Sequence, residues 1–225
     1  MNLRNFNYSY FVKTLNQKKF FLAQVYATLI FEIFIAYVVL MYAENRNINI
    51  TRIQYYGLII ALFLIIISIA FMTSPIIKFI LFTLFAAGTG LTFSLRIDIK
   101  NGENAEETNE IVKKAFITTC VIFIFLTLFG FFAAFMGARI SPIVTITLLF
   151  ALLLLIIVTF VLSITGKYAT YHKIITGIVI FLFSIFIVYD TVSILDRNYE
   201  GDFITAALDY FLDFINMFSA LLDSN

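Results

Sequence analysis

The stretch FLAQVYATLIFEIFIAYVVLMYA, residues 21–43, decides the class of fold. It is long enough to cross a bilayer, because a transmembrane helix needs about 20 mostly apolar residues. One acid, Glu32, interrupts it near the middle. Six further stretches meet the same criterion, at residues 55–74, 76–95, 112–135, 142–164, 174–195 and 203–222. The sequence therefore predicts an all-α membrane protein with seven transmembrane helices.

The composition points the same way. Hydrophobic residues make up 62% of the chain and charged residues only 13%, whereas about 25% of the residues of a soluble domain are charged. The chain lacks the charge to cover a soluble surface, so we expect the lipid bilayer to surround it. A net charge of +1 gives no reason to expect a nucleic-acid partner. The apolar runs are also too long, and too little alternating, for the strands of a membrane β-barrel.

The connections between these stretches predict one domain. Most are short, and Pro75 and Pro142 stand at boundaries, where a missing N–H is harmless. The one sizeable connection, residues 96–114, is polar, and we predict a solvated loop there. No repeat or second domain is visible, so residues 1–225 are predicted to form a single transmembrane domain, and we expect a monomer.

The charges of the N-terminal tail predict the orientation. Basic residues concentrate on the cytoplasmic side of membrane proteins, and the tail has no acid, which favours a cytoplasmic N-terminus. A composition rich in Phe, Ile, Lys and Asn hints at a bacterial source, hence the inner membrane. The basic residues of the tail are Arg4, Lys13, Lys18 and Lys19.

Acids inside the predicted spans are the most informative feature of the chain. A charge at the middle of a bilayer costs about 2.5–3.5 kcal/mol on insertion scales. No basic residue lies deep inside a predicted span, and Lys78 and Arg96 lie at span ends. The intramembrane acids must therefore be neutralised by a proton, a bound cation or a neighbouring donor. They are Glu32, Asp190, Asp209 and Asp213.

The aspartates of the last two helices could form a pair. Only residues 196–202 join these helices, so we expect them to be antiparallel neighbours. Two adjacent carboxyls tend to share one proton. Counting residues from the helix ends places Asp190 at the depth of Asp209 rather than Asp213, while Asp209, Asp213 and Asn216 share one helix face. The residues alone leave the partner of Asp190 open.

Two segments carry a resemblance to a known family. YDTVSIL (189–195) and AALDYFLDFINMFSALL (206–222) resemble the C-terminal signature of the Bax inhibitor-1, or transmembrane Bax inhibitor motif, family. FLAQVY (21–26), GTGLTFS (88–94) and AFITTCVIF (115–123) are similar to earlier parts of it. The resemblance implies that helix seven is surrounded by helices one to six. It also implies a pH-sensitive calcium leak.

The resemblance assigns roles to particular residues. Asp190 and Asp213 match the proton-sharing, pH-sensing aspartate pair of the family, which would bind calcium only transiently during transport. Helix two (55–74) lacks a basic residue to match the arginine that latches this pair in the family. We further predict Asp209, Asn216 and Glu32 as auxiliary cation or proton sites. Protons and calcium are the expected ligands, with no tightly bound cofactor.

Two other functions would use the same acids. A proton-coupled cation exchanger would move cations against a gradient, which a leak does not. An intramembrane aspartyl protease needs YD in one helix and GxGD in the next. YD is present at 189–190, but the corresponding stretch, YEGD (199–202), lacks the first glycine. We therefore predict a channel rather than an enzyme.

Overall fold

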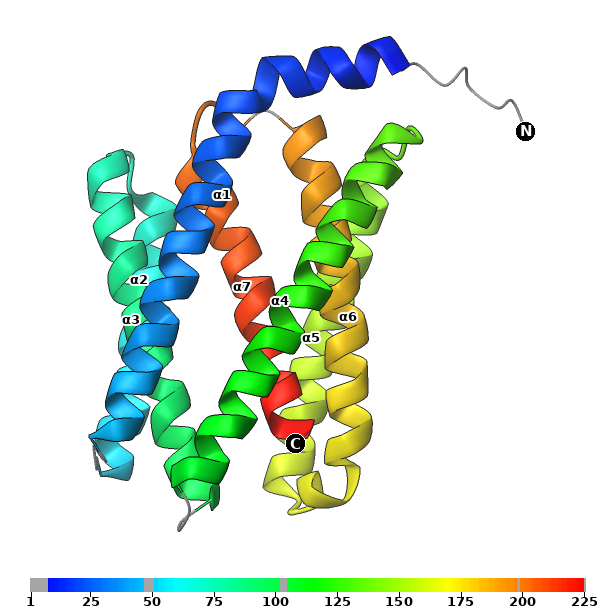
Figure 1. Ribbon diagram of the computed structural model, residues 1–225. Helices are drawn as coiled ribbons and strands as arrows, with labels where there is room; N and C mark the ends of the chain where they lie inside the picture. Colours follow the sequence, from blue (N-terminus) through cyan, green and yellow to red (C-terminus); the bar gives the residue numbers. More distant parts are fainter. Residues whose placement is uncertain (1–7, 47–50, 102–104, 198, 225) are drawn as a thin grey trace. The chain divides into compact units, whose positions relative to one another are not determined.

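The computed structural model describes residues 8–46, 51–101, 105–197 and 199–224, and within these ranges it contains seven α-helices and no strand (Figure 1). All seven are long and apolar enough to cross a membrane. The all-helical, seven-span prediction is thus confirmed, and the chain is an integral membrane protein. The helices are α1 (Tyr8–Asn45), α2 (Arg52–Phe71), α3 (Pro75–Asn101), α4 (Ala105–Phe135), α5 (Pro142–Ile164), α6 (Tyr168–Asp196) and α7 (Phe203–Ser224).

Local sequence signals explain where several helices begin. Pro75 and Pro142 are the first residues of α3 and α5, where proline's fixed φ suits the helix and its absent N–H is not needed. Thr51 caps α2 reciprocally with Gln54. The Gln54 N–H donates to Thr51 Oγ1 at 3.3 Å, and the Thr51 N–H donates to Gln54 Oε1 at 2.9 Å. Each of these helix starts is therefore encoded locally.

Glycines end two helices. Gly137 (φ +88°) follows α4 and Gly166 (φ +67°) follows α5. The N–H of the residue after each glycine donates a hydrogen bond to a carbonyl five residues earlier. The Ala138 N–H donates to the Ala133 carbonyl and the Lys167 N–H to the Leu162 carbonyl, both at 2.9 Å. This is the Schellman arrangement, in which the left-handed residue is usually glycine. It lets the chain reverse within a few residues.

Several helices extend beyond the predicted apolar stretches. Residues 96–101 and 105–114, predicted as parts of a polar loop, are helical, because α3 continues to Asn101 and α4 begins at Ala105; the residues between them lie outside the described part of the chain. Lysine, arginine and glutamate are good helix formers, so a helix can continue beyond its apolar stretch. For the same reason α1 begins at Tyr8 rather than at residue 21, and α6 at Tyr168 rather than at 174.

The chain forms two compact units, and three helices (α1, α4 and α7) contribute to both. The prediction that α7 is surrounded by the other six helices therefore stays a prediction, as does the single domain. The first unit comprises the described residues of Met1–Lys19, Lys114–Asn198 and Leu212–Asn225. The second comprises those of Phe20–Lys113 and Tyr199–Phe211.

In the first unit, α5 and α6 are neighbours and α4 packs closely on α6. A Cβ added at Gly130 of α4 would lie 2.5 Å from the Cβ of Thr191, so only glycine allows this approach. The C-terminal part of α7 is held to α4 by edge-to-face aromatic contacts. In these, Phe214 packs against Phe116 and Phe123 at centroid distances of 5.8 and 5.7 Å.

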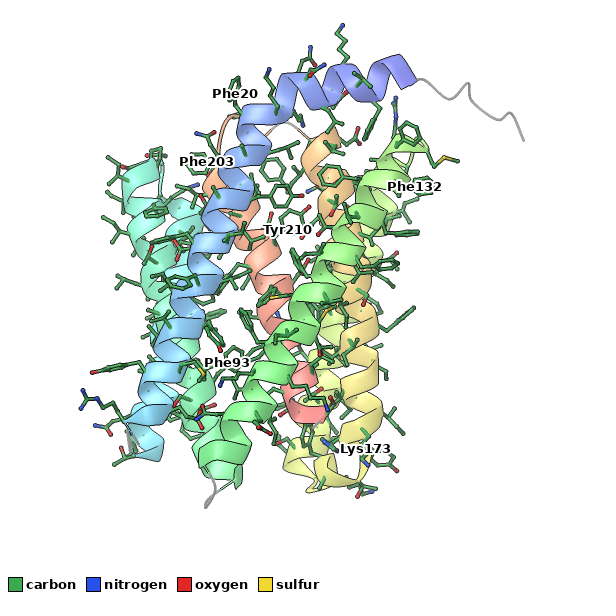
Figure 2. All side chains as sticks on the ribbon, viewed as in Figure 1. Phe20, Phe93, Phe132, Lys173, Phe203 and Tyr210 are labelled. Atoms are coloured by element: carbon green, nitrogen blue, oxygen red, sulfur yellow. The ribbon has the colours of Figure 1, made fainter. Side chains whose placement is uncertain are left out.

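In the second unit, α2 and α3 lie side by side (Figure 1). Phe211 of α7 packs edge-to-face against Phe82 and Phe85 of α3 at 5.3 and 5.9 Å. Tyr210, labelled in Figure 2, is fully buried beside it, and its hydroxyl lies 3.1 Å from that of Tyr26 on α1. The first half of α7 therefore joins α1 and α3 in one aromatic core.

Candidate functional site

The first unit contains a pair of acidic side chains on two helices. Asp190 lies in α6, and Asp213 lies in the C-terminal half of α7. Their carboxyl groups share a hydrogen bond. Asp213 is 4% exposed and Asp190 is half-buried. The structure thus brings these two predicted residues together inside the membrane-spanning part of the chain.

Packing holds both acids in place. Thr191, next to Asp190, is fully buried and is the residue that meets Gly130 of α4. Phe214, next to Asp213, is the ring that packs against α4. Each acid therefore directly precedes a residue that packs against α4. The distance between the two carboxyls is thus set by close-packed side chains rather than by loops.

The hydrogen bond itself indicates a proton. An ionised carboxylate can only accept hydrogen bonds, whereas a protonated carboxyl also donates one. Two carboxylates would repel each other in this buried setting. The contact between Asp190 and Asp213 therefore corresponds to a state in which at least one of them is protonated.

A basic residue that the sequence did not predict lies beside the pair. Arg197 follows the last residue of α6, and its guanidinium attracts the Asp190 carboxylate. It donates hydrogen bonds to the Tyr189 hydroxyl and, at 3.3 Å, to Thr145 Oγ1. It also lies 5.6 Å from the centre of the Tyr189 ring. The available signal was spacing, because residues 190 and 197 are two helical turns apart and share a face.

A second basic residue binds the end of α6. Lys18 donates from Nζ to the carbonyl of Ile194 at 2.8 Å and to that of Arg197 at 2.5 Å. The last carbonyls of a helix have no partner within the helix and carry partial negative charge. The Lys18 ammonium therefore stabilises this end of α6. The two carbonyls that it contacts follow Asp190 by four and seven residues.

The three auxiliary residues are divided between the two units. Asn216 lies in the first unit, and its Nδ2 donates to the carbonyl of Leu212 in its own helix at 2.7 Å. Asp209 and Glu32 belong to the second unit. Counting residues from the helix ends favoured Asp209 as the partner of Asp190, whereas in the structure Asp190 shares a hydrogen bond with Asp213.

The second unit contains an acid with a basic partner. Lys78 of α3 forms an ion pair with Asp202, which also accepts hydrogen bonds from the N–H of Thr205 at 3.1 Å and its hydroxyl at 2.7 Å. Burial alone would raise the pKa of Asp202, but Lys78 and Thr205 together hold that pKa below its ordinary value. Lys78 thus anchors the start of α7 rather than reaching for solvent.

A resident metal needs more ligands than the pair offers. Among the described residues, no group of three or more His, Cys, Asp or Glu side chains is placed to hold a metal ion. Calcium takes six to eight oxygen ligands in a stable site. Asp190 and Asp213 supply two carboxyl groups.

Fold and site together define a polytopic integral membrane protein with an intramembrane carboxyl pair. The model of the family described as inhibitor of apoptosis-promoting Bax1 matches residues 18–224. The chain therefore belongs to the Bax inhibitor family, as the C-terminal signature indicated. It is also 32% identical over 113 residues to an uncharacterised protein of Campylobacter jejuni. That alignment covers 50% of this chain and 46% of the relative.

Proposed function

We propose that the protein is a pH-sensitive calcium leak channel, gated by protonation of the Asp190–Asp213 pair. The observation that carries the proposal is the hydrogen bond between these two carboxyls within transmembrane helices. Membership of the Bax inhibitor family supports a membrane transport role. Ionisable groups within a membrane most often mark an ion or proton path.

At low pH the pair holds one or two protons. The shared hydrogen bond then ties α6 to the C-terminal half of α7, next to the aromatic contacts with α4. A pair with one proton carries one negative charge, which the guanidinium of Arg197 offsets. In this state the two helices stay in contact, and the path for cations is closed.

As the pH rises, the last shared proton leaves and the hydrogen bond is lost. Two carboxylates at this distance repel each other and attract a divalent cation. The repulsion separates the C-terminal half of α7 from α6, and calcium moves down its gradient past the two carboxylates. Two oxygen-bearing side chains bind calcium too weakly to retain it, so the ion passes through.

The proposed protein is a channel and not an enzyme, it carries no resident cofactor, and it works as a monomer. We place it in a bacterial inner membrane with its N-terminus in the cytoplasm. The bacterial relative and the basic N-terminal tail support this placement.

Calcium flux into liposomes tests the proposal. The purified protein is reconstituted with a calcium dye inside, and flux is followed from about pH 5 to about pH 8. We expect wild-type flux to rise with pH, and Asp190→Asn and Asp213→Asn to remove this dependence. Asp196→Asn is the matched control, because Asp196 is an exposed acid at the end of the same helix.

Two results would overturn the proposal. One is a wild-type protein that passes no calcium at any pH. The other is a pair of aspartate variants that keep the wild-type pH profile. Calcium uptake against its gradient, driven by a proton gradient, would instead identify an exchanger that uses the same acids.

A further inference from the structure

A third acid is enclosed in the second unit. Glu32, near the middle of the long apolar part of α1, is 0% exposed. Its Oε1 lies 2.8 Å from Oγ1 of Thr83 on α3. Its Oε2 is buried and has no hydrogen-bond partner among the described residues. The side chain thus has one polar neighbour in an otherwise apolar place.

Close packing of α1 on α3 seals this position. A Cβ added at Gly90 would lie 2.2 Å from the carbonyl oxygen of Ala36, so the two backbones touch one turn along from Glu32. The rings of Phe31, next to Glu32, and Phe79 on α3 also stack, at a centroid distance of 5.7 Å. Water and lipid are therefore kept from the carboxyl.

The contacts of Thr83 indicate which state Glu32 is in. The Thr83 hydroxyl also lies 3.0 Å from the carbonyl oxygen of Phe79, one turn earlier in its own helix. A carbonyl can only accept, and a hydroxyl has a single hydrogen to give. Both contacts are full hydrogen bonds only if Thr83 donates to Phe79 and accepts from Glu32. The hydrogen in the second bond must then come from a protonated carboxyl.

In the described spans of α1, α2, α3 and α7 within this unit, no basic side chain is left to neutralise an ionised Glu32. Lys78 is the one basic residue in the described spans of α1, α2, α3 and α7 within this unit, and it pairs with Asp202. The other charged side chains on these spans, Glu44 and Asp209, are acids. Tyr26 and Tyr210 contact each other through their hydroxyls. The surroundings therefore favour the neutral carboxyl.

A cation would fit this position poorly. Glu32 and Thr83 together offer three oxygens, whereas hard divalent cations need six or more. Among the described residues, Glu32 belongs to no group of three or more His, Cys, Asp or Glu side chains that could hold a metal ion. A proton needs only one acceptor and leaves no charge in the membrane interior.

We propose that Glu32 and Thr83 form a second intramembrane proton-binding site, in which a protonated Glu32 donates its hydrogen bond to Thr83. The site lies in the second unit, whereas the Asp190–Asp213 pair belongs to the first. Its ligand is a proton, and Thr83 is a positioning residue that relays the hydrogen bond to the Phe79 carbonyl.

Infrared spectroscopy of the reconstituted protein tests the proposal near pH 7. A protonated carboxyl absorbs apart from a carboxylate, and glutamate labelled with ¹³C at its carboxyl separates glutamate bands from aspartate bands. We expect wild type to show a protonated glutamate band that Glu32→Gln removes. Thr83→Val should shift this band to higher frequency by breaking the hydrogen bond, and Thr83→Ser should restore it.

The outcomes separate this proposal from the proposed channel. The double variant Asp190→Asn/Asp213→Asn should keep the glutamate band, whatever it does to calcium flux. If labelled wild type shows no protonated glutamate band, Glu32 is ionised and the proposal is wrong. This reading needs no variant to fold. A band that persists unshifted in Thr83→Val would assign the proton to another glutamate and would also overturn it.

Discussion

Asp190 in the first unit and Asp202 in the second are the same residue type with opposite partners. Asp190 meets a second acid, Asp213, and needs a proton to make their hydrogen bond. Asp202 meets Lys78 and accepts its hydrogen bonds as a carboxylate. The two aspartates lie near opposite ends of the connection between α6 and α7, yet one side chain holds a proton and the other holds a charge.

The difference shows what makes a carboxyl responsive to pH. A carboxylate paired with lysine stays ionised over the physiological range, because removing its charge would leave the lysine alone. A carboxyl facing another carboxyl is poised between states that differ by one proton. Asp202 can therefore anchor the start of α7 at any physiological pH, while the Asp190–Asp213 contact can be switched by pH.

Removing either acid of the pair should have the largest effect. In Asp190→Asn or Asp213→Asn, no second charge can develop, so the separation of the helices no longer depends on pH. A buried charge costs about 2.5–3.5 kcal/mol, or roughly 10²-fold in the ratio of open to closed states. In wild type, calcium flux into liposomes at high pH should exceed the flux at low pH by a factor of that order, and either variant should abolish this difference. If either variant keeps the wild-type ratio of flux at high and low pH, the aspartate pair does not respond to pH, and its contrast with Asp202 is lost.

The ion pair in the second unit should affect stability rather than gating. Asp202→Ala leaves Lys78 without its partner and removes the cap on Thr205. We expect a loss of about 2–3 kcal/mol of unfolding free energy, below the roughly 3–5 kcal/mol of a fully buried pair, because the side chain of Asp202 is 32% exposed. Asp202→Asn, which keeps the cap, should lose less. Thermal unfolding in detergent measures both.

The same pair gives a pH prediction with a definite sign. The pKa of Asp202 is lowered in the folded chain, so the unfolded chain takes up the proton first as pH falls. The pair therefore stabilises the protein above the ordinary aspartate pKa, and this contribution is lost as pH falls through the folded-state value. The stability gap between wild type and Asp202→Asn should be constant around neutral pH and close in acid. A gap that widens in acid would contradict the ion pair.

Disrupting the close packing beside the aspartate pair should have the next largest effect, on stability. Gly130→Ala forces a methyl group against Thr191, and we expect a loss of about 1–2 kcal/mol, within the roughly 1–3 kcal/mol typical of overpacking. Gly57→Ala in α2 is the matched control, because nothing lies within 4 Å of its added Cβ, and alanine is the better helix former. Equal melting temperatures for the two variants would show that α4 does not fix Asp190.

Arg197 should give the smallest effect. Arg197→Gln removes a positive charge that favours ionisation of the pair, so a higher pH is needed to drive off the last proton. Arg197 is exposed, and exposed charges contribute about 0.2–1 kcal/mol. The midpoint of the flux profile should therefore move up by less than about one pH unit, while Arg197→Lys stays close to wild type. A downward shift would show that Arg197 does not act through the pair.

Much of this fold could be predicted from the sequence, since seven apolar stretches leave little choice but helices across a bilayer. Pro75 and Pro142 fixed two helix starts for a local reason. The helical parts of the segment 96–114 could not be predicted, because hydropathy marks where the apolar stretch ends and not where the helix ends.

The site was harder to predict, because it depends on contacts between helices. Asp190 and Asp213 came from the family resemblance, while depth alone favoured Asp209. The pairing of Lys78 with Asp202 joins α3 to the start of α7, and no local pattern indicates that contact. Arg197 was missed because its charge lies just outside the span, where basic residues are ordinary.

The most direct test compares single and double variants of the aspartate pair. Calcium flux is measured against pH for Asp190→Asn, Asp213→Asn and Asp190→Asn/Asp213→Asn. If one shared proton controls the channel, the double variant has the same flat profile as either single variant, because each already removes the shared site. Two distinct shifts in the single variants that add in the double variant would mean that the acids titrate separately, and would contradict the proton-sharing gate.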